Sequence, residues 1–184
     1  MSDAPLAVRS STNPRDLTFW SLLLSVAIAD VATKRWAEQA LGLHAPEEVV
    51  GHWLRWTLTY NTGAAMNLSL GSASRVVFSL IALAMIVYLF RLYRQSPPDA
   101  RATPAAIALI SAGALGNLLD RLRHTKGVVD FIDVGTAEWR FWTFNVADMG
   151  VTTGALLLAL LLWREDAAAA RIHPTPSPDQ GPST

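Results

Sequence analysis

The sequence predicts an α-helical integral membrane protein with four transmembrane helices and a small extramembrane β-sheet. Four separate apolar runs occupy residues 17–32, 76–90, 103–119 and 145–163. Each run is slightly shorter than the roughly 20 residues that span a bilayer core, so its polar neighbours belong at helix ends or inside the bundle. Hydrophobic residues make up 51% of the chain and charged residues 16%, which is more apolar than an ordinary soluble domain. One segment between the first two runs instead alternates with period two, as strands do.

The first run, LTFWSLLLSVAIADVA, is apolar apart from Asp30. It could be a cleaved signal peptide, because residues 27–29 form a small-x-small cleavage sequence, or it could be the first transmembrane helix. The three apolar runs that follow favour the helix. Asp30 and Lys34 are four residues apart and share a helical face, where spacing alone favours an ion pair at the membrane surface. Residues 1–16 are polar, show no periodicity and predict a disordered tail.

The segment around residues 46–70 predicts a small sheet. Four apolar residues from Leu54 to Tyr60 alternate with polar ones, which is typical of a half-exposed strand. The alternation resumes after Asn61-Thr62-Gly63 and continues to Leu70. Because Asn and Gly tolerate positive φ, we expect the chain to turn at Asn61 to Gly63.

The remaining runs predict closely packed helices. Small residues four apart allow two helices to approach; such pairs are Ala112 with Gly116 in the third run, and Gly150 with Gly154 in the fourth. Residues 164–184, rich in alanine and proline, predict a second disordered tail.

Composition excludes several function classes. The 15 basic residues balance the 15 acidic ones, so no net charge attracts nucleic acid. The absence of cysteine excludes disulfides, thiol nucleophiles and thiolate metal sites, and the four histidines have no metal-ligand spacing. We therefore expect no metal and no cofactor. Carboxylates, asparagines, arginines and hydroxyls are left to carry any chemistry.

Basic residues in short connections predict the orientation. With four spans, one side holds Arg9, Arg15, Arg91, Arg94, Arg101, Arg164 and Arg171. We expect this side, with both termini, to be cytoplasmic. The basic residues of the opposite side are interleaved with acidic ones, as in a folded module, so the sheet belongs outside.

Two aspartates are the candidate catalytic residues. Asp130 and Asp148 each lie where an apolar run meets a polar loop, an expensive place for a carboxylate. Two carboxylates held close together share a proton at neutral pH. The ionised one can take a proton from water as it attacks a peptide carbonyl, while the protonated one donates to the carbonyl or the leaving amine.

Further polar residues converge on the same membrane face. Asn145 lies three residues before Asp148, and Asn117 lies four before Arg121, which suits a phosphate or a backbone carbonyl. Taken singly, each has a simpler explanation. Asn117, Asp120 and Arg121 could form an interhelical hydrogen-bond cluster, Asp148 could be an N-terminal helix charge, and Asp133 a solvated loop residue.

Three other functions stay open on the residues alone. Intramembrane aspartates also build proton relays, so a small ion- or proton-coupled transporter subunit is one alternative. A non-enzymatic membrane scaffold is another. A serine peptidase with Lys34 or His124 as base is the third, although no serine stands in a recognisable nucleophile context.

Five motifs in order resemble one family. They are Asp30 with Lys34, NTGAAM at 61–66, GALGNLLDR at 113–121, VVDFIDV at 128–134 and FNVAD at 144–148. Together they resemble lipoprotein signal peptidase, also called signal peptidase II, the bacterial inner-membrane aspartic peptidase. The resemblance runs from about Asp30 to Gly154.

The resemblance implies a monomeric four-helix enzyme with a small periplasmic sheet and a short periplasmic helix. The segment at about 122–143 would form this periplasmic loop or helix. Asp130 and Asp148 would be the catalytic pair. The implied substrate is a diacylglyceryl-modified prolipoprotein that enters sideways from the membrane lipid and is cut before its lipidated cysteine. Residues that would bind substrate or support the pair are Asn61, Gly63, Asn117, Arg121, Asn145, Asp30 and Lys34; Asp120 would be scaffold.

Two stretches depart from the family pattern. Members usually have Phe-Ser where this chain has Met66-Asn67, and Ser or Thr followed by Ala-Ile where it has Met149-Gly150-Val151. Both lie beside the expected site, so they bear on its shape and substrate range.

Overall fold

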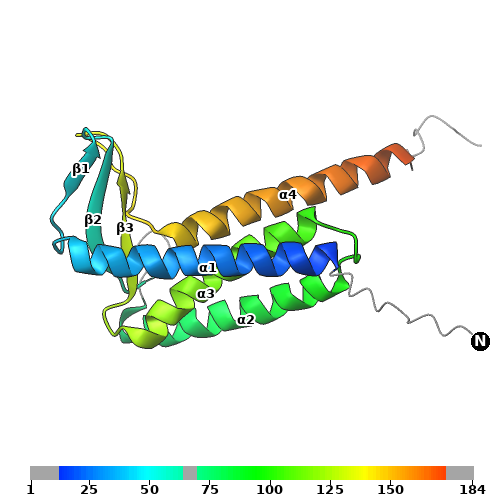
Figure 1. The fold of residues 1–184 in the computed structure, drawn as a ribbon, viewed down its shortest axis with the longest axis horizontal. Coiled ribbons are helices and arrows are strands. Elements are labelled where there is room, and N and C mark those ends of the chain that lie inside the picture. The colour runs from blue at the N-terminus through cyan, green and yellow to red at the C-terminus, as the bar shows by residue number, and fades with distance from the viewer. Residues whose placement is uncertain (1–12, 64–69, 173–184) are drawn as a thin grey trace, which may run out of the picture.

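Four long helices form a bundle with a small sheet at one end (Figure 1). The computed structural model describes residues 13–63 and 70–172. The helices are α1 (Pro14–Ala40), α2 (Ser74–Gln95), α3 (Ala102–Arg123) and α4 (Val146–Ile172). Each is long and apolar enough to cross a membrane. The predicted membrane fold class is confirmed.

Two helices are longer than the apolar runs predicted. α1 begins at Pro14, because the fixed φ of proline suits the first turn of a helix. α4 continues to Ile172, since the alanines after Asp166 are strong helix formers. The tails expected at 1–16 and 164–184 are therefore partly helical, and the rest of each, 1–12 and 173–184, lies outside the described residues.

The sheet has the antiparallel order β1-β2-β3, with β1 (Glu47–Val50), β2 (Leu54–Asn61) and β3 (Val128–Val134). β2 matches the predicted alternating strand, and its described partners are β1 and β3. The turn expected at Asn61 to Gly63 leads into residues that the structure does not describe. Residues 64–69, where the alternation resumed, lie outside the described residues. Leu70 precedes a one-turn 3₁₀ helix, η2 (Gly71–Ala73).

The segment at about 122–143 was expected to be a loop or helix, and it contains strand β3 instead. The VVDFIDV sequence of β3 is rich in β-branched and aromatic residues, which pack well on a pleated surface. Because β2 offers a free edge, β3 pairs with it across a long stretch of chain.

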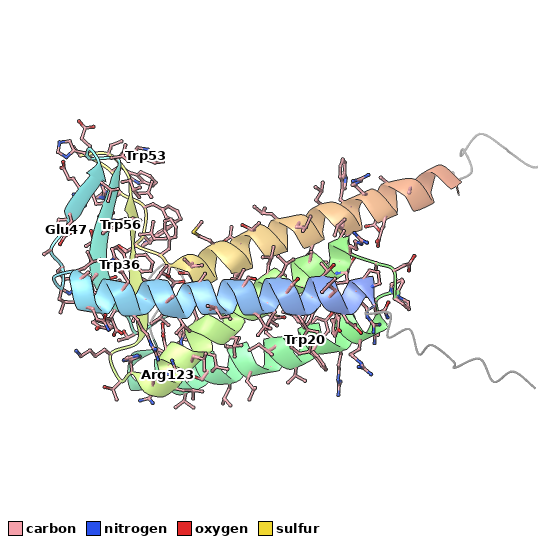
Figure 2. All side chains as sticks on the ribbon, viewed as in Figure 1. Trp20, Trp36, Glu47, Trp53, Trp56 and Arg123 are labelled. Atoms are coloured by element: carbon pink, nitrogen blue, oxygen red, sulfur yellow. The ribbon has the colours of Figure 1, made fainter. Side chains whose placement is uncertain are left out.

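The sheet lies beside the C-terminal end of α1 and the N-terminal end of α4 (Figure 1). The start of α1 and the α2–α3 connection lie at the opposite end. A buried cluster of Ala37, Leu41, Leu58, Val129 and Phe131 holds the sheet to α1. The Trp36 ring meets the rings of Trp56 and Phe131 edge-on at 5.6 and 5.9 Å, at the junction visible in Figure 2.

Glycines let α3 and α4 approach closely, as the small-residue spacing predicted. A Cβ on Gly150 would meet the Leu109 carbonyl oxygen at 3.1 Å, and one on Gly154 would meet the Ala106 carbonyl oxygen at 2.7 Å. On α3, Gly116 lies directly against the carboxylate of Asp30. This close packing brings α1, α3 and the start of α4 together at the sheet end of the bundle.

Candidate active site

Backbone pairing of β3 brings Asp130 close to the start of α4. Thr59 of β2 is the register partner of Asp130. The chain after β3 then folds back along it, so that the Phe144 and Ile132 amides donate to each other's carbonyl oxygens at 3.0 and 2.8 Å. The next residue, Asn145, therefore lies beside Asp130, and its Nδ2 donates to Asp130 Oδ1 at 2.6 Å.

Asn145 and Asp148 form a reciprocal cap at the start of α4. The Asp148 amide donates to Asn145 Oδ1 at 2.9 Å, and the Asn145 amide donates to Asp148 Oδ2 at 3.1 Å. Such a capping box satisfies backbone N–H groups that a helix start leaves unpaired. It also holds Asp148 in a fixed position, with the buried Asn145 between it and Asp130.

Two residues of α3 complete this arrangement. Asn117 Nδ2 donates to the second oxygen of Asp148, Oδ1, at 2.8 Å. Arg121 donates through one guanidinium nitrogen to the Gly63 carbonyl oxygen at 2.9 Å and through the other to the Asn117 carbonyl oxygen at 3.1 Å. The Gly63 amide in turn donates to Asn61 Oδ1 at 2.9 Å. The preference of Arg121 for a carbonyl, expected from its chemistry, is met within the chain.

The ion pair of Asp30 with Lys34 that spacing favoured is present, but it lies in the protein interior behind this group, so its expected place at the membrane surface is wrong. Asp30 is 0% and Lys34 3% exposed. Lys34 Nζ lies 2.8 Å from Asp30 Oδ2 and 2.9 Å from Asp120 Oδ2. Asp30 Oδ1 accepts from the Ala147 amide at 2.8 Å, so it satisfies another N–H at the start of α4. Tertiary packing, not helix spacing, decided this placement.

Asp120 has the scaffold contacts expected of it. Besides Lys34, its carboxylate accepts from the Val129 amide at 3.2 Å, which ties the end of α3 to β3.

A cavity of about 590 Å³ opens in front of the two aspartates. Its lining comes from β2, α3, β3, the chain before α4, and α4: Thr59, Tyr60, Asn61, Asn117, Arg121, Val128, Asp130, Phe141, Trp142, Thr143, Phe144, Asp148, Val151 and Thr152. The polar lining residues, here called the polar wall, include both aspartates. The aromatic wall is Phe141, Trp142 and Phe144. Of the predicted site residues, four do not line the cavity: Gly63, Asn145, Asp30 and Lys34. Gly63, Asn145 and Lys34 hydrogen-bond to residues that do, and Asp30 pairs with Lys34.

The aromatic wall was missed from the sequence. Phe141, Trp142 and Phe144 line the cavity, although no periodic pattern marks them. The signal that could have found them is the aromatic-rich string WRFWTF, which lies between the two candidate aspartates.

The two aspartates differ in their surroundings. Burial and the nearby negative charge of Asp148 together raise the pKa of Asp130 to about 7, although hydrogen bonds from Asn145 and Asn61 oppose the change. Asp148 receives two N–H donors, at a helix N-terminus that favours negative charge. At neutral pH this geometry suits one protonated and one ionised carboxyl group.

Asp133 is not the solvated loop residue that its position in the sequence suggested. It is buried, and its carboxylate accepts from Arg55 at 2.7 Å, Thr57 at 2.9 Å and Arg140 at 2.5 Å. Burial alone would raise its pKa, but these hydrogen bonds outweigh burial and hold the pKa below its usual value. Asp133 therefore joins β2, β3 and the following loop.

Among residues 13–63 and 70–172, no group of three histidine or acidic side chains is arranged to hold a metal ion. The chemistry of the described cavity is that of carboxyl, amide, guanidinium and hydroxyl groups.

Known proteins resemble this chain over most of its length. Residues 22–164 match the family model described as signal peptidase (SPase) II. A lipoprotein signal peptidase of Pseudomonas syringae pv. tomato is 38% identical, over 92% of this chain and 99% of its own. One from Ectopseudomonas mendocina is 42% identical, over 80% and 90%.

Solved structures agree with these matches. One described as a bacterial membrane enzyme superposes with a TM-score of 0.74 at 30% identity, covering 82% of this chain and 90% of its own. Another of that description gives 0.70 at 32% identity, covering 79% and 92%. The fold, the motif order and the matched range together show that the chain belongs to the signal peptidase II family and is a membrane peptidase.

Proposed function

We propose that this chain removes the signal peptide from diacylglyceryl-modified prolipoproteins, cutting before the lipidated cysteine, by means of an aspartic pair. The observation that carries the proposal is the placement of Asp130 and Asp148. Both line one cavity and are joined through Asn145. Family membership favours a peptidase over the transporter and scaffold alternatives.

The two carboxyl groups divide the work of hydrolysis. A water between them attacks the scissile carbonyl carbon and gives a proton to the ionised Asp148. Asp130, which holds its proton near neutral pH, donates it to the carbonyl oxygen as negative charge develops there. Collapse of the tetrahedral intermediate breaks the C–N bond. The leaving amine takes the proton from Asp148, and one hydroxyl of the intermediate returns its proton to Asp130 as the carboxylic acid product forms. Asn145, which hydrogen-bonds to both carboxyl groups, holds them in fixed positions throughout.

The cavity walls suit a lipid-linked peptide. The polar wall faces the scissile peptide bond, whereas Phe141, Trp142 and Val151 offer apolar contacts to side chains or to the glyceryl-linked chains. Of the departures from the family pattern, Met66-Asn67 lies outside the described residues. Met149 is exposed and Gly150 packs on α3, so only Val151 of that stretch bears on the cavity.

The membrane orientation follows from the arginines. Arg15, Arg91, Arg94, Arg101 and Arg164 lie on elements at the end opposite the sheet. By the positive-inside rule, this distribution supports an orientation with that end and both termini in the cytoplasm, and with the cavity at the outer face of the inner membrane. The substrate then enters from the outer leaflet, and one copy of the chain holds the whole site.

The test is cleavage of a synthetic diacylglyceryl-modified prolipoprotein by the purified chain in detergent, with products identified by mass spectrometry. The expected product of the wild-type chain begins at the lipidated cysteine. The same peptide without lipid measures the contribution of the diacylglyceryl group, and Asp148→Asn is the inactive comparison. Cleavage at another bond, or equal cleavage by folded Asp148→Asn, overturns the proposal.

A further inference from the structure

Lys34 is a buried cation that the proposed chemistry does not use. Its ammonium group contacts three acceptors: Asp30 at 2.8 Å, Asp120 at 2.9 Å and Asn117 Oδ1 at 3.0 Å. An ammonium group has three hydrogens and no acceptor, so all of its donors are used. Of these three partners, Asn117 leads directly to the aspartic pair, because its Nδ2 donates to Asp148.

The orientations of the Asn145 and Asn117 side-chain amides follow from neighbouring groups that can only donate a hydrogen bond. The backbone N–H of Asp148 can only donate, so Oδ1 of Asn145 faces it, and Nδ2 of Asn145 faces Asp130. Lys34 also can only donate, so the oxygen of Asn117 faces Lys34. Asn145 Nδ2 adds a second donor to that same oxygen at 3.3 Å. The Asn117 amide nitrogen is thereby left to point at Asp148.

We propose that Lys34 is a positioning residue that fixes the Asn117 amide and, through it, makes Asp148 the proton acceptor of the pair. The inference rests on the proposed function. With Asn117 reversed, its oxygen would face Asp148 Oδ1, and two acceptors can share a hydrogen bond only if the carboxyl group is protonated. A protonated Asp148 cannot take a proton from water. Lys34 thus acts on the chemical step without touching substrate.

Two acidic side chains contact the ammonium group of Lys34. Asp30 on α1 and Asp120 on α3 face it directly, and a second cavity of about 210 Å³ adjoins it, lined also by Arg35, Glu38, Arg123 and His124. Arg123 lies at the sheet end of α3 (Figure 2). Asp148 lies beyond Asn117. These two carboxylates are the paired charges that a lysine 3% exposed requires.

The test is a double-mutant cycle on kcat with Lys34→Met, Asn117→Ala and the two together. If Lys34 acts through Asn117, Lys34→Met lowers kcat about 10- to 100-fold in the wild-type background, as expected for loss of a residue that orients a reacting group. In the Asn117→Ala background it lowers kcat less than about threefold. KM changes less than about threefold on Lys34→Met, because Lys34 does not line the cavity.

Two controls separate positioning from folding. Where Lys34→Met does not fold, the cycle is run with Asp120→Asn added. Loss of one cation and one anion leaves the net charge of the group of Lys34, Asp30 and Asp120 unchanged. The side-chain oxygen of the asparagine introduced at position 120 can still accept from the Val129 amide. Arg35→Met, which removes a neighbouring exposed charge, keeps wild-type kcat.

Each outcome decides the inference. Additive losses of kcat in the cycle, or a rise in KM with unchanged kcat, overturn the positioning role of Lys34 while leaving the aspartic pair in place. A wild-type chain that cleaves no lipidated substrate overturns the proposed function itself, and the inference with it.

Discussion

Asp130 and Asp133 lie on one strand, three residues apart, both less than 5% exposed, and their environments are opposite. Asp130 faces a cavity, accepts from neutral amides and has a pKa raised to about 7. Asp133 faces two guanidinium groups and has a pKa held below its usual value.

The difference teaches that burial alone does not make a carboxyl group reactive. Burial favours the neutral form of both residues, and their partners decide the outcome. Arg55 and Arg140 lock Asp133 in its ionised form, so it can only accept. Asp130 has no such cation in direct contact among the described residues, which leaves its proton available for transfer.

The largest expected effect is on catalysis. Asp130→Asn should lower kcat about 10³-fold or more, because the amide cannot donate a proton to the developing oxyanion and recover it. Asp133→Asn, the matched change at the other end of the strand, should leave kcat within about threefold, since Asp133 does not line the cavity. Steady-state assays on the lipidated substrate measure both, and equal losses would remove the distinction between the two residues.

The next effect is on stability. Asp133→Asn should lower the free energy of unfolding by about 3 kcal/mol or somewhat less, because it leaves two guanidinium groups without their anion. The loss is moderated by water, since Arg55 and Arg140 are 23% and 20% exposed. Thermal or denaturant unfolding in detergent measures it. Unchanged stability would mean that this ion-pair group contributes nothing net.

The pH dependence sharpens the comparison. Activity should fall as pH rises through about 7, because Asp130 must keep its proton to act as the acid. A profile of kcat/KM between about pH 5 and 9 tests this, with Asp133→Asn as the control that keeps the same alkaline limb. Activity that stays level up to about pH 9 would assign the acid to another group.

The smallest expected effect is a gain of stability at the cavity. Because the folded pKa of Asp130, about 7, lies above the ordinary 3.8, the wild-type chain loses stability as pH rises between these values. Asp130→Asn lacks this loss, and its oxygen can still accept from Asn145. At pH 8 its melting temperature should exceed that of wild type by roughly 2 to 4 °C. The pH dependence of stability at Asp133 has the opposite sign, because its contribution to stability is lost as pH falls through its lowered pKa.

Local sequence patterns predicted much of the fold. Apolar runs located all four helices, and period-two alternation located β2. The sheet partners could not be predicted, because β2 pairs with β3 across more than 60 residues. Alternation along one strand does not determine which strand it pairs with or in which register. The helix ends were misplaced at Pro14 and Ile172, where capping and propensity, rather than hydrophobicity, set the limit.

The candidate site was predicted in its polar residues and not in its apolar ones. Asp130, Asp148, Asn61, Asn117 and Arg121 line a common cavity, and Asn145 lies between the two aspartates. Their assignment as catalytic and supporting residues stays a prediction. Phe141 and Trp142 were missed because loop aromatics have no period, and only the fold-back of Phe144 onto Ile132 turns them toward the cavity.

The sequence by itself determined that the chain is a four-helix membrane protein of one recognisable family, because hydrophobic runs and short motifs are local and survive without a fold. Only the tertiary structure decided which charges are buried and what they touch. Lys34 reaches Asn117 across 83 residues, and Asp30 caps α4 across 117. Such contacts depend on close helix packing at glycines and on strand register. The spacing of the contacting residues in the sequence predicts neither of these.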